Sequence, residues 1–205
     1  MTIILVRHGE TAFNRDGQGL GRSDVPLTEV GQAQGRAIAR RLTPFSVGRV
    51  VTSPLSRAAT FAEWIAAEHG VAVEASDALL ELDVGETEGM GFPEMRERFP
   101  EFLSTWAGPE GWKARMPGGE SIQDLGLRLQ PLVAELLLPS ESDTVVVSHN
   151  FVLRTILCLL LKLDLERFRA FQVDLASATF LTVRNGRVSV TSVNDTCHLV
   201  NLSVA

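Results

Sequence analysis

Short runs of β-branched residues alternate with helical segments along most of this chain, and two of these runs end directly at a histidine. The run from Ile3 to Val6 stops before Arg7 and His8, and the run from Asp143 to Ser148 ends at His149. Apolar runs of this length are typical of parallel strands that are covered on both faces. The alternation therefore predicts an α/β architecture in which polar residues gather at the carboxyl ends of strands.

Helix caps and turn residues predict the other elements. Thr28 is a typical N-cap for a helix that runs to Leu42, and Asn185-Gly186 is a strong two-residue hairpin turn. We expect further strands at 49–52, 71–73, 178–184 and 187–193, and helices at 55–69, 121–138 and 151–163. These elements predict a three-layer αβα sandwich with a mostly parallel sheet and one antiparallel edge.

The domain organisation predicted for the 205 residues is a single domain over 1–205. The segment from about 81 to 119 differs in composition, and we expect a small inserted helical subdomain there. Its large apolar side chains form either a lid over a site or the core of the insert, and both interpretations stay open. They are Met90, Phe92, Met95, Phe99, Phe102, Trp106 and Trp112.

The charge balance restricts the partners of the chain. Its 19 Lys and Arg against 25 Asp and Glu give a net charge of −6, which argues against nucleic acid or anionic lipid and favours a small molecule. The N-terminus does not resemble a signal peptide, and the longest apolar stretch is too short and too interrupted to span a membrane. Cys158 and Cys197 belong to no metal-binding pattern, so we expect two reduced thiols, with a single disulfide as the alternative. These features predict a cytoplasmic protein.

Four basic side chains follow predicted strands and would meet at one edge of the sheet. Arg7 and His8 end the first strand, Arg57 lies in the first helical turn after the second, and His149 follows the triple-valine strand. A single histidine at a strand end is more often structural, but two arginines and two histidines together suit a compact dianion, most simply a phosphoryl group. The sequence contains no phosphate-binding P-loop, zinc-protease motif or serine nucleophile elbow.

Five motifs in order resemble the histidine phosphatase superfamily, the phosphoglycerate mutase-like proteins. Together they extend from residue 3 to about residue 198. They are Leu5-Val6-Arg7-His8-Gly9-Glu10-Thr11 with Asn14, Gly21, Asp24-Val25-Pro26-Leu27-Thr28 and Gly31; Ser53-Pro54-Leu55-Ser56-Arg57-Ala58; Glu81 with Gly85 and Glu88-Gly89; Pro117-Gly118-Gly119-Glu120-Ser121; and Val147-Ser148-His149 with Arg154.

The resemblance implies that His8 attacks phosphorus to form a phosphohistidine. It also implies that Arg7, Arg57 and His149 bind the transferring group, that Asn14, Gly21 and Asn150 contribute to substrate binding, and that Glu81 is the general acid. Flanking guanidinium groups keep a nucleophilic imidazole neutral and stabilise the transition state, so we expect neither a metal ion nor a cofactor.

Two positions depart from the family pattern. Glu86-Thr87 replace a common aromatic residue, and Asn150-Phe151 replace a common glycine-containing pair after His149. Asp83, Glu86 and Glu88 remain alternatives to Glu81 as the acid. Away from the motifs, we expect His69 to complement the end of a helix and His198 to be structural.

The predicted activity is the hydrolysis of a small phosphorylated metabolite through a phosphohistidine. The alternative is a cofactor-dependent phosphoglycerate mutase. Mutases of the family carry an Arg-Arg pair in a longer insert, whereas this insert has only the scattered cations Arg96, Arg98, Lys113 and Arg115. A remote third alternative is an inactive module that binds phosphoproteins. A homodimer is possible.

Overall fold

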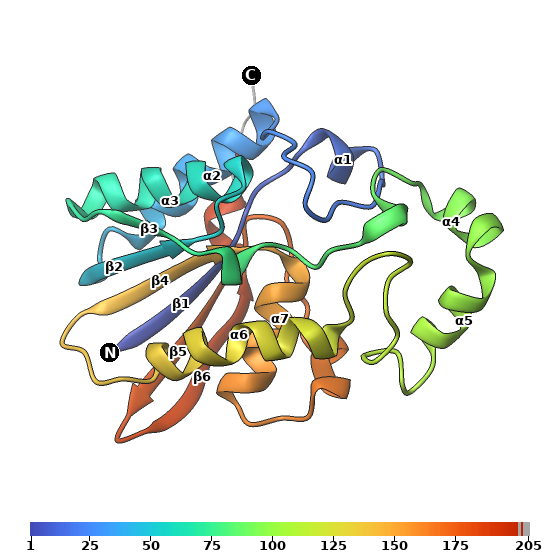
Figure 1. Cartoon of the computed structure of the whole chain (residues 1–205). Helices are drawn as coiled ribbons and strands as arrows, with labels where there is room; N and C mark the ends of the chain where they lie inside the picture. Colours follow the sequence, from blue (N-terminus) through green and yellow to red (C-terminus); the bar gives the residue numbers. More distant parts are fainter. Residues whose placement is uncertain (201, 203–205) are drawn as a thin grey trace.

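A six-stranded sheet lies between two layers of helices in the computed structural model, which describes residues 1–200 and 202 (Figure 1). The strand order is β3-β2-β4-β1-β5-β6, and the first four strands in this order are parallel. The antiparallel strands β5 and β6 form one edge. The predicted fold class is confirmed. The strands are β1 Thr2–Arg7, β2 Val47–Thr52, β3 Val73–Ala75, β4 Asp143–Ser148, β5 Ala178–Arg184 and β6 Arg187–Asp195.

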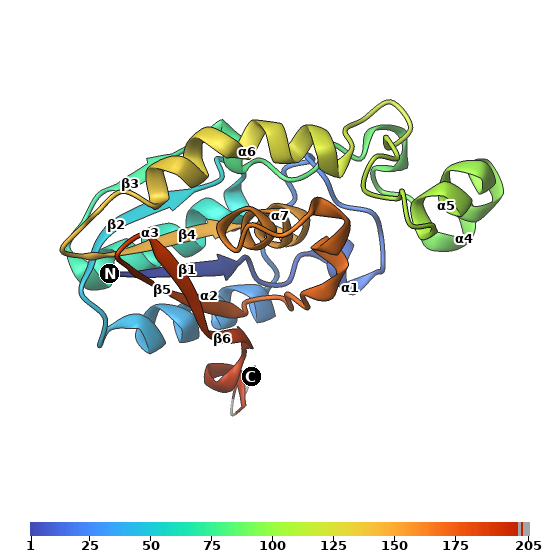
Figure 2. The ribbon, with the colours of Figure 1, turned by 90° about the horizontal axis from the view of Figure 1, so that it is seen from below.

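Helices lie on both faces of the sheet (Figure 2). Alternating side chains of the strands build a separate core on each face. Ile3 and Leu5 of β1 pack with α6 Ile122–Leu136 and α7 Asn150–Leu160. Their neighbours Ile4 and Val6 pack with α2 Glu29–Leu42 and α3 Ser56–His69. Both faces of β1 are buried, as its uninterrupted apolar run predicted.

The predicted helix ends agree with the structure to within a few residues. Thr28 caps α2 by accepting a hydrogen bond from the Gly31 amide, and Gly70 ends α3 in the left-handed conformation with φ 65°. The helix predicted to reach residue 163 ends at Leu160, and Lys162 already has φ 55°. None of the described helices has both the length and the apolar character needed to cross a membrane.

The strand predicted at 71–73 lies at Val73–Ala75 instead. Its position is set by pairing with β2, where Val73 lies opposite Val50. Residues 71 and 72 connect the left-handed turn at Gly70 to the strand and do not themselves pair in the sheet. The local sequence contains no signal for this register.

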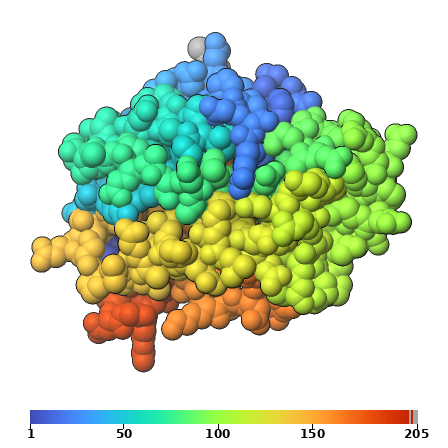
Figure 3. Space-filling view, viewed as in Figure 1, coloured from blue at the N-terminus to red at the C-terminus, as the bar shows by residue number. Residues whose placement is uncertain are grey.

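The segment predicted as an insert lies beside the carboxyl ends of the parallel strands. It contains α4 Phe92–Arg98 and α5 Pro100–Ala107, which lie at one end of the molecule next to the loop after β1 (Figure 3). Its status as a separate subdomain stays a prediction, and residues 201 and 203–205 of the predicted domain lie outside the described residues. The short elements are α1 Ala12–Arg15, η1 Asp77–Leu79, η2 Gly85–Thr87, η3 Leu165–Ala170 and η4 Cys197–Leu199.

Candidate active site

The predicted cationic residues converge at the carboxyl ends of β1, β2 and β4. These strands end level with one another, because Arg7 pairs with Ser148 and Thr52 pairs with Val147. His8 and His149 each follow a strand end, and their rings lie 5.1 Å apart between centroids. The sheet register therefore brings together two histidines that are far apart in the sequence.

His8 is held in one tautomer by its own loop. Its Nδ1 donates a hydrogen bond of 2.7 Å to the carbonyl oxygen of Gly9, because a carbonyl can only accept. In the neutral ring, Nε2 therefore carries the lone pair. Burial lowers the pKa of His8 well below its ordinary value, and the positive charges of Arg57 and Arg7 lower it further. The ring is thus neutral at neutral pH, which is the form that a nucleophilic role requires.

His149 is completely buried and hydrogen-bonded to Ser53 of the second motif. Its Nε2 lies 2.8 Å from Oγ of Ser53, and this Oγ also accepts a hydrogen bond from the Leu55 amide. Because Oγ of Ser53 already accepts this hydrogen bond, its own proton is available to donate to Nε2 of His149. The proton of the neutral His149 ring then lies on Nδ1, which has no partner among the described residues. Burial lowers the pKa of His149 well below its ordinary value, and the positive charges of Arg57 and Arg7 lower it further.

Arg7 and Arg57 are oriented by backbone carbonyl groups rather than by carboxylates. Arg7 donates to the carbonyl oxygen of Val173 at 2.7 Å, and Arg57 donates to those of Ser23 and Gly21 at 2.7 and 2.6 Å. Burial lowers the pKa of Arg7 to about 10 and also lowers that of Arg57, which leaves both guanidinium groups charged at neutral pH. Neither forms an ion pair within the described part of the chain.

The other three predicted substrate-binding residues surround this group. Asn14 and Arg7 line an open cavity of about 590 Å³, and the side-chain carbonyl of Asn14 accepts hydrogen bonds from Thr11. The Gly21 amide donates a hydrogen bond to Glu88, and the Gly21 carbonyl oxygen accepts one from Arg57. These contacts position Arg57 and leave the amide engaged with Glu88. Asn150 begins α7, and its buried Oδ1 has no partner among the described residues. Direct binding by these three residues stays a prediction.

Glu81 is a buried carboxyl group next to the arginines. Its Oε1 accepts a hydrogen bond of 2.8 Å from the Leu82 amide, and its Oε2 accepts one of 3.3 Å from the Phe151 amide. Burial raises the pKa of Glu81, although these two hydrogen bonds and the charges of Arg7 and Arg57 lower it. A carboxyl group with a raised pKa beside a phosphoryl site is suited to general acid catalysis.

The three alternative acids are placed less favourably. Asp83 accepts from the Gly85 amide and pairs with Arg22 at 3.5 Å, and Glu86 is exposed. Glu88 accepts from the amides of Gly21 and Arg22. These contacts favour Glu81 as the acid and give Glu88 the task of holding the glycine-containing loop after β1.

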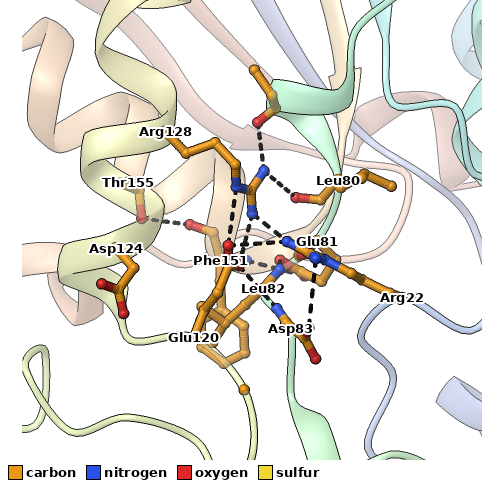
Figure 4. A network of polar contacts seen from close by, with 12 residues as sticks. Arg22, Leu80, Glu81, Leu82, Asp83, Glu120, Asp124, Arg128, Phe151 and Thr155 are labelled. Carbon is orange, nitrogen blue, oxygen red and sulfur yellow. Dashed lines mark hydrogen bonds and ion pairs between the residues drawn. The ribbon is translucent and has the colours of Figure 1, made fainter.

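A polar network that the sequence did not predict holds the backbone around Glu81 (Figure 4). Arg128 of α6 donates to the carbonyl oxygens of Ala78 and Leu80 at 2.7 and 2.9 Å, and it pairs with Glu120 at 2.9 Å. Glu120 also pairs with Arg22 and accepts from the Asp83 amide. The fourth motif therefore fixes the segment that carries Glu81. Glu120 lies in that motif, but no local pattern distinguishes Arg128 from an exposed helical arginine.

The remaining histidines and the cysteines lie outside this group. His69 is in the last turn of α3, as predicted, and His198 donates from Nε2 to the carbonyl oxygen of Ala176 at 2.9 Å, in keeping with the structural role predicted for it. Ligand atoms of Asp195, Cys197 and His198 lie within 4.8 Å of one another, but Asp195 already accepts from the Cys197 amide, and we assign no metal to them. Both cysteines are free, as expected.

The aromatic residues of the predicted insert divide between two environments. Phe102, Trp106 and Trp112 pack against the core beneath α6 and α7, whereas Phe92 is exposed. The Trp106 ring meets Phe151 edge to face with 5.8 Å between centroids, and the Phe151 amide binds Glu81. Trp106 therefore packs against Phe151, the residue whose backbone amide contacts Glu81, and these aromatic residues join the main core rather than forming a separate one.

The fold and the convergent histidines and arginines define a class of phosphoryl-transfer protein, and comparison with known proteins agrees. The model of the histidine phosphatase superfamily (branch 1) matches residues 3–196. The chain is 33% identical to phosphoserine phosphatase 1 of Hydrogenobacter thermophilus over 96% of this chain and 93% of the relative. It is also 33% identical to the probable phosphoglycerate mutase GpmB of Yersinia enterocolitica over 97% of this chain and 95% of the relative.

A solved structure extends this similarity to three dimensions. The structure of a mycobacterial glucosyl-3-phosphoglycerate phosphatase in complex with VO3 superposes with a TM-score of 0.87 at 27% identity, covering 95% of this chain and 99% of the other. This chain belongs to the histidine phosphatase superfamily, whose members are phosphatases and mutases.

Proposed function

We propose that this protein hydrolyses a small phosphorylated metabolite through a phosphohistidine formed on His8. The observation that carries the proposal is a buried imidazole with its Nδ1 committed to Gly9, beside two arginines that are oriented by backbone carbonyl groups and form no ion pair with a described carboxylate. The relatives named as phosphatases of phosphoserine and glucosyl-3-phosphoglycerate support this class of substrate.

The first chemical step transfers the phosphoryl group to the enzyme. Nε2 of His8 forms a bond to phosphorus as the bond to the ester oxygen breaks, and the protonated Glu81 gives its proton to the departing alcohol. Arg7 and Arg57 neutralise the charge on the phosphoryl oxygens, and His149 donates from Nδ1. The lowered pKa of His8 favours its neutral form, and the raised pKa of Glu81 shifts this carboxyl group toward its protonated form.

The second step releases phosphate. Glu81, now a carboxylate, takes a proton from a water molecule that attacks phosphorus, and the bond to His8 breaks. The neutral imidazole and the protonated acid are restored, so the two steps balance. The positive charge that each step needs comes from arginine, and we therefore propose that the reaction requires no metal ion.

The similarity to a probable phosphoglycerate mutase makes mutase activity the second candidate. The two activities share the phosphohistidine and differ in what receives the phosphoryl group. In the predicted insert, Arg98 pairs with Glu94, and Lys113 pairs with Glu110. These engaged cations do not form a carboxylate site in the insert, and this favours hydrolysis.

Rapid quenching during turnover of a radiolabelled phosphomonoester tests the proposal. The protein should carry a label that survives base and is lost in acid, and His8→Ala should abolish it. His69→Ala, at the far end of α3, is the matched control and should retain the label. The label should also form after dialysis against EDTA. An acid-stable, base-labile label would indicate an acyl phosphate and contradict the assignment of His8.

A further inference from the structure

Ala176, in the turn before β5, has a backbone conformation that its residue type disfavours. Its φ is 56°, in the left-handed region where a Cβ is strained. The Ser177 amide donates to the carbonyl oxygen of Asp174 at 3.1 Å, so Ala176 is the third residue of a tight turn. A positive φ at this position is normally supplied by glycine. Strain of this kind persists only where surrounding contacts impose the conformation.

The strained turn is bonded directly to Arg7 and His8. The Ala176 amide donates to the carbonyl oxygen of His8 at 3.0 Å, and the Arg7 amide donates to that of Ser177 at 3.1 Å. The guanidinium group of Arg7 donates to the carbonyl oxygen of Val173, just before the turn, at 2.7 Å. The conformation of the turn therefore sets the backbone position of the proposed nucleophile and the direction of one phosphoryl-binding arginine.

The carbonyl group of Ala176 is held by a side chain from the segment after β6. Its oxygen accepts a hydrogen bond of 2.9 Å from Nε2 of His198, and no other described group donates to it. If Ala176 rotated to a negative φ, its amide and its carbonyl group would change direction relative to each other. The hydrogen bonds to His8 and from His198 could then not both remain. His198 thus opposes the relaxation that would release the strain.

The short helix η4 fixes the position of His198. Asp195 accepts a hydrogen bond of 2.9 Å from the Cys197 amide, and Leu199 packs against the core shared with α2 and α3. The buried Nδ1 of His198 has no partner among the described residues, so the bond to Ala176 is the one hydrogen bond of the ring within this part of the chain. The ring is therefore fixed in space and directed at the turn.

Asn194 of β6 holds the first residue of the same turn. Its Oδ1 accepts from the Asp174 amide at 2.6 Å, and its Nδ2 donates to the Asp174 carboxylate at 2.8 Å. With this end secured, Ala176 is the point at which the turn can still relax.

We propose that His198 is a positioning residue, which keeps the strained turn at Ala176 in the conformation that aligns Arg7 and His8 for phosphoryl transfer. His198 acts through the Ala176 carbonyl group and contacts no reacting atom. This inference rests on the proposed function and extends the structural role of His198 to the rate of that reaction.

Two amide substitutions of His198 test the hydrogen bond, because they differ by one methylene group. A glutamine amide nitrogen reaches about as far as Nε2 of histidine, whereas an asparagine amide does not. With p-nitrophenyl phosphate, kcat/KM should fall about 10-fold in His198→Asn and His198→Ala and about threefold or less in His198→Gln. Calorimetric titration with inorganic phosphate should give the same order of affinities, because a displaced turn also displaces Arg7.

Ala176→Gly tests the route through the strained turn. Glycine adopts a positive φ without strain, so the turn should keep its conformation when the hydrogen bond is lost. In the Ala176→Gly background, His198→Ala should therefore lower kcat/KM by about threefold or less, against about 10-fold in the unaltered background. Cys197→Ala is the control, because Cys197 is the exposed neighbour of His198, and it should leave both measurements unchanged.

Urea unfolding separates positioning from folding. If His198→Asn loses stability but keeps its kcat/KM and its phosphate affinity, His198 is merely structural and the inference is overturned. An equal loss from His198→Ala in both backgrounds would also overturn it, because the effect would not pass through Ala176. Absence of phosphate release from every phosphomonoester would instead refute the proposed hydrolysis, and the phosphate affinities would still decide the role of His198.

Discussion

Several opposing effects set the pKa of Glu81. Its carboxyl group is 4% exposed, and burial raises its pKa against the effects of two backbone hydrogen bonds and two nearby arginines. A bound phosphate dianion adds negative charge and raises the pKa further. In the proposed mechanism, the same group is therefore an acid while the ester is bound and a base after the alcohol has left.

Glu81→Gln should separate these two roles. With an alkyl phosphate, kcat should fall about 10²-fold or more, because a poor leaving group needs the proton. With p-nitrophenyl phosphate, the leaving group departs without a proton, whereas hydrolysis of the phosphohistidine still lacks its base. Stopped-flow absorbance should therefore show a burst of nitrophenol equal to the enzyme concentration. Glu86→Gln, at an exposed neighbouring position, should show steady turnover without the slow phase.

The pH dependence of the same reaction follows from the direction of the shift. The active form of Glu81 in the first step is protonated, so kcat for alkyl phosphates should fall as pH rises through its raised pKa. His8 should add no titration near neutral pH, because its pKa is well below the ordinary value. The alkaline fall should be absent in Glu81→Gln. An unchanged alkaline limb in that variant would assign the titration to another group.

At the scale of whole elements, helix α6 supports the backbone segment before Glu81. Its N-terminus is fixed by the capping box of Ser121 and Asp124, and this sets the position from which Arg128 reaches the segment before Glu81. A glycine is required where that segment meets the fourth motif. Gly85 has φ 53°, and a Cβ there would clash with the carbonyl oxygen of Pro117. The third and fourth motifs therefore form one unit on the end of α6.

Arg128→Ala should weaken this unit and the catalysis that depends on it. Losing hydrogen bonds from a charged donor and leaving Glu120 with fewer partners should lower the free energy of unfolding by about 2–3 kcal/mol. Urea unfolding measures this change. The exposed pair of Arg98 and Glu94 provides the control, since Arg98→Ala should cost about 0.5 kcal/mol or less. Arg128→Lys should rescue little, because a lysine cannot reproduce the forked contacts.

The whole molecule determines whether water or an alcohol receives the phosphoryl group. A mutase must retain the alcohol in a closed site and exclude water. In the predicted insert, Arg98 and Lys113 pair with neighbouring glutamates and Arg96 lies over the ring of Phe92, while Phe102 and Trp106 pack against the core. Arg115, the remaining cation near the fourth motif, pairs with Asp124.

We therefore expect hydrolysis to exceed isomerisation. With 3-phosphoglycerate and catalytic 2,3-bisphosphoglycerate, inorganic phosphate should appear at the rate at which phosphoester is consumed, and little 2-phosphoglycerate should form. Both products are followed in one assay, with His8→Ala as the blank. Rapid formation of 2-phosphoglycerate with negligible phosphate release would contradict the phosphatase assignment while retaining the chemistry of His8.

Much of the fold was predictable because its signals are local. The apolar run of β1, the N-cap at Thr28 and the turn at Asn185-Gly186 each depend on adjacent residues, and all three occur where expected. The short strand β3 was displaced because its register depends on pairing with β2. The motifs likewise predicted which histidines and arginines lie together at the strand ends, since these residues directly follow strands or begin a helix.

The sequence by itself determined the α/β order, the superfamily and the residues that can carry phosphoryl transfer. Only the tertiary structure decided the protonation states and the supporting contacts. Burial and the charges of Arg57 and Arg7 keep His8 neutral, burial raises the pKa of Glu81, and the role of Arg128 depends on the carbonyl groups that lie opposite it. Caps and strand patterns act over a few residues, whereas desolvation and charge act through space between segments that the chain separates widely.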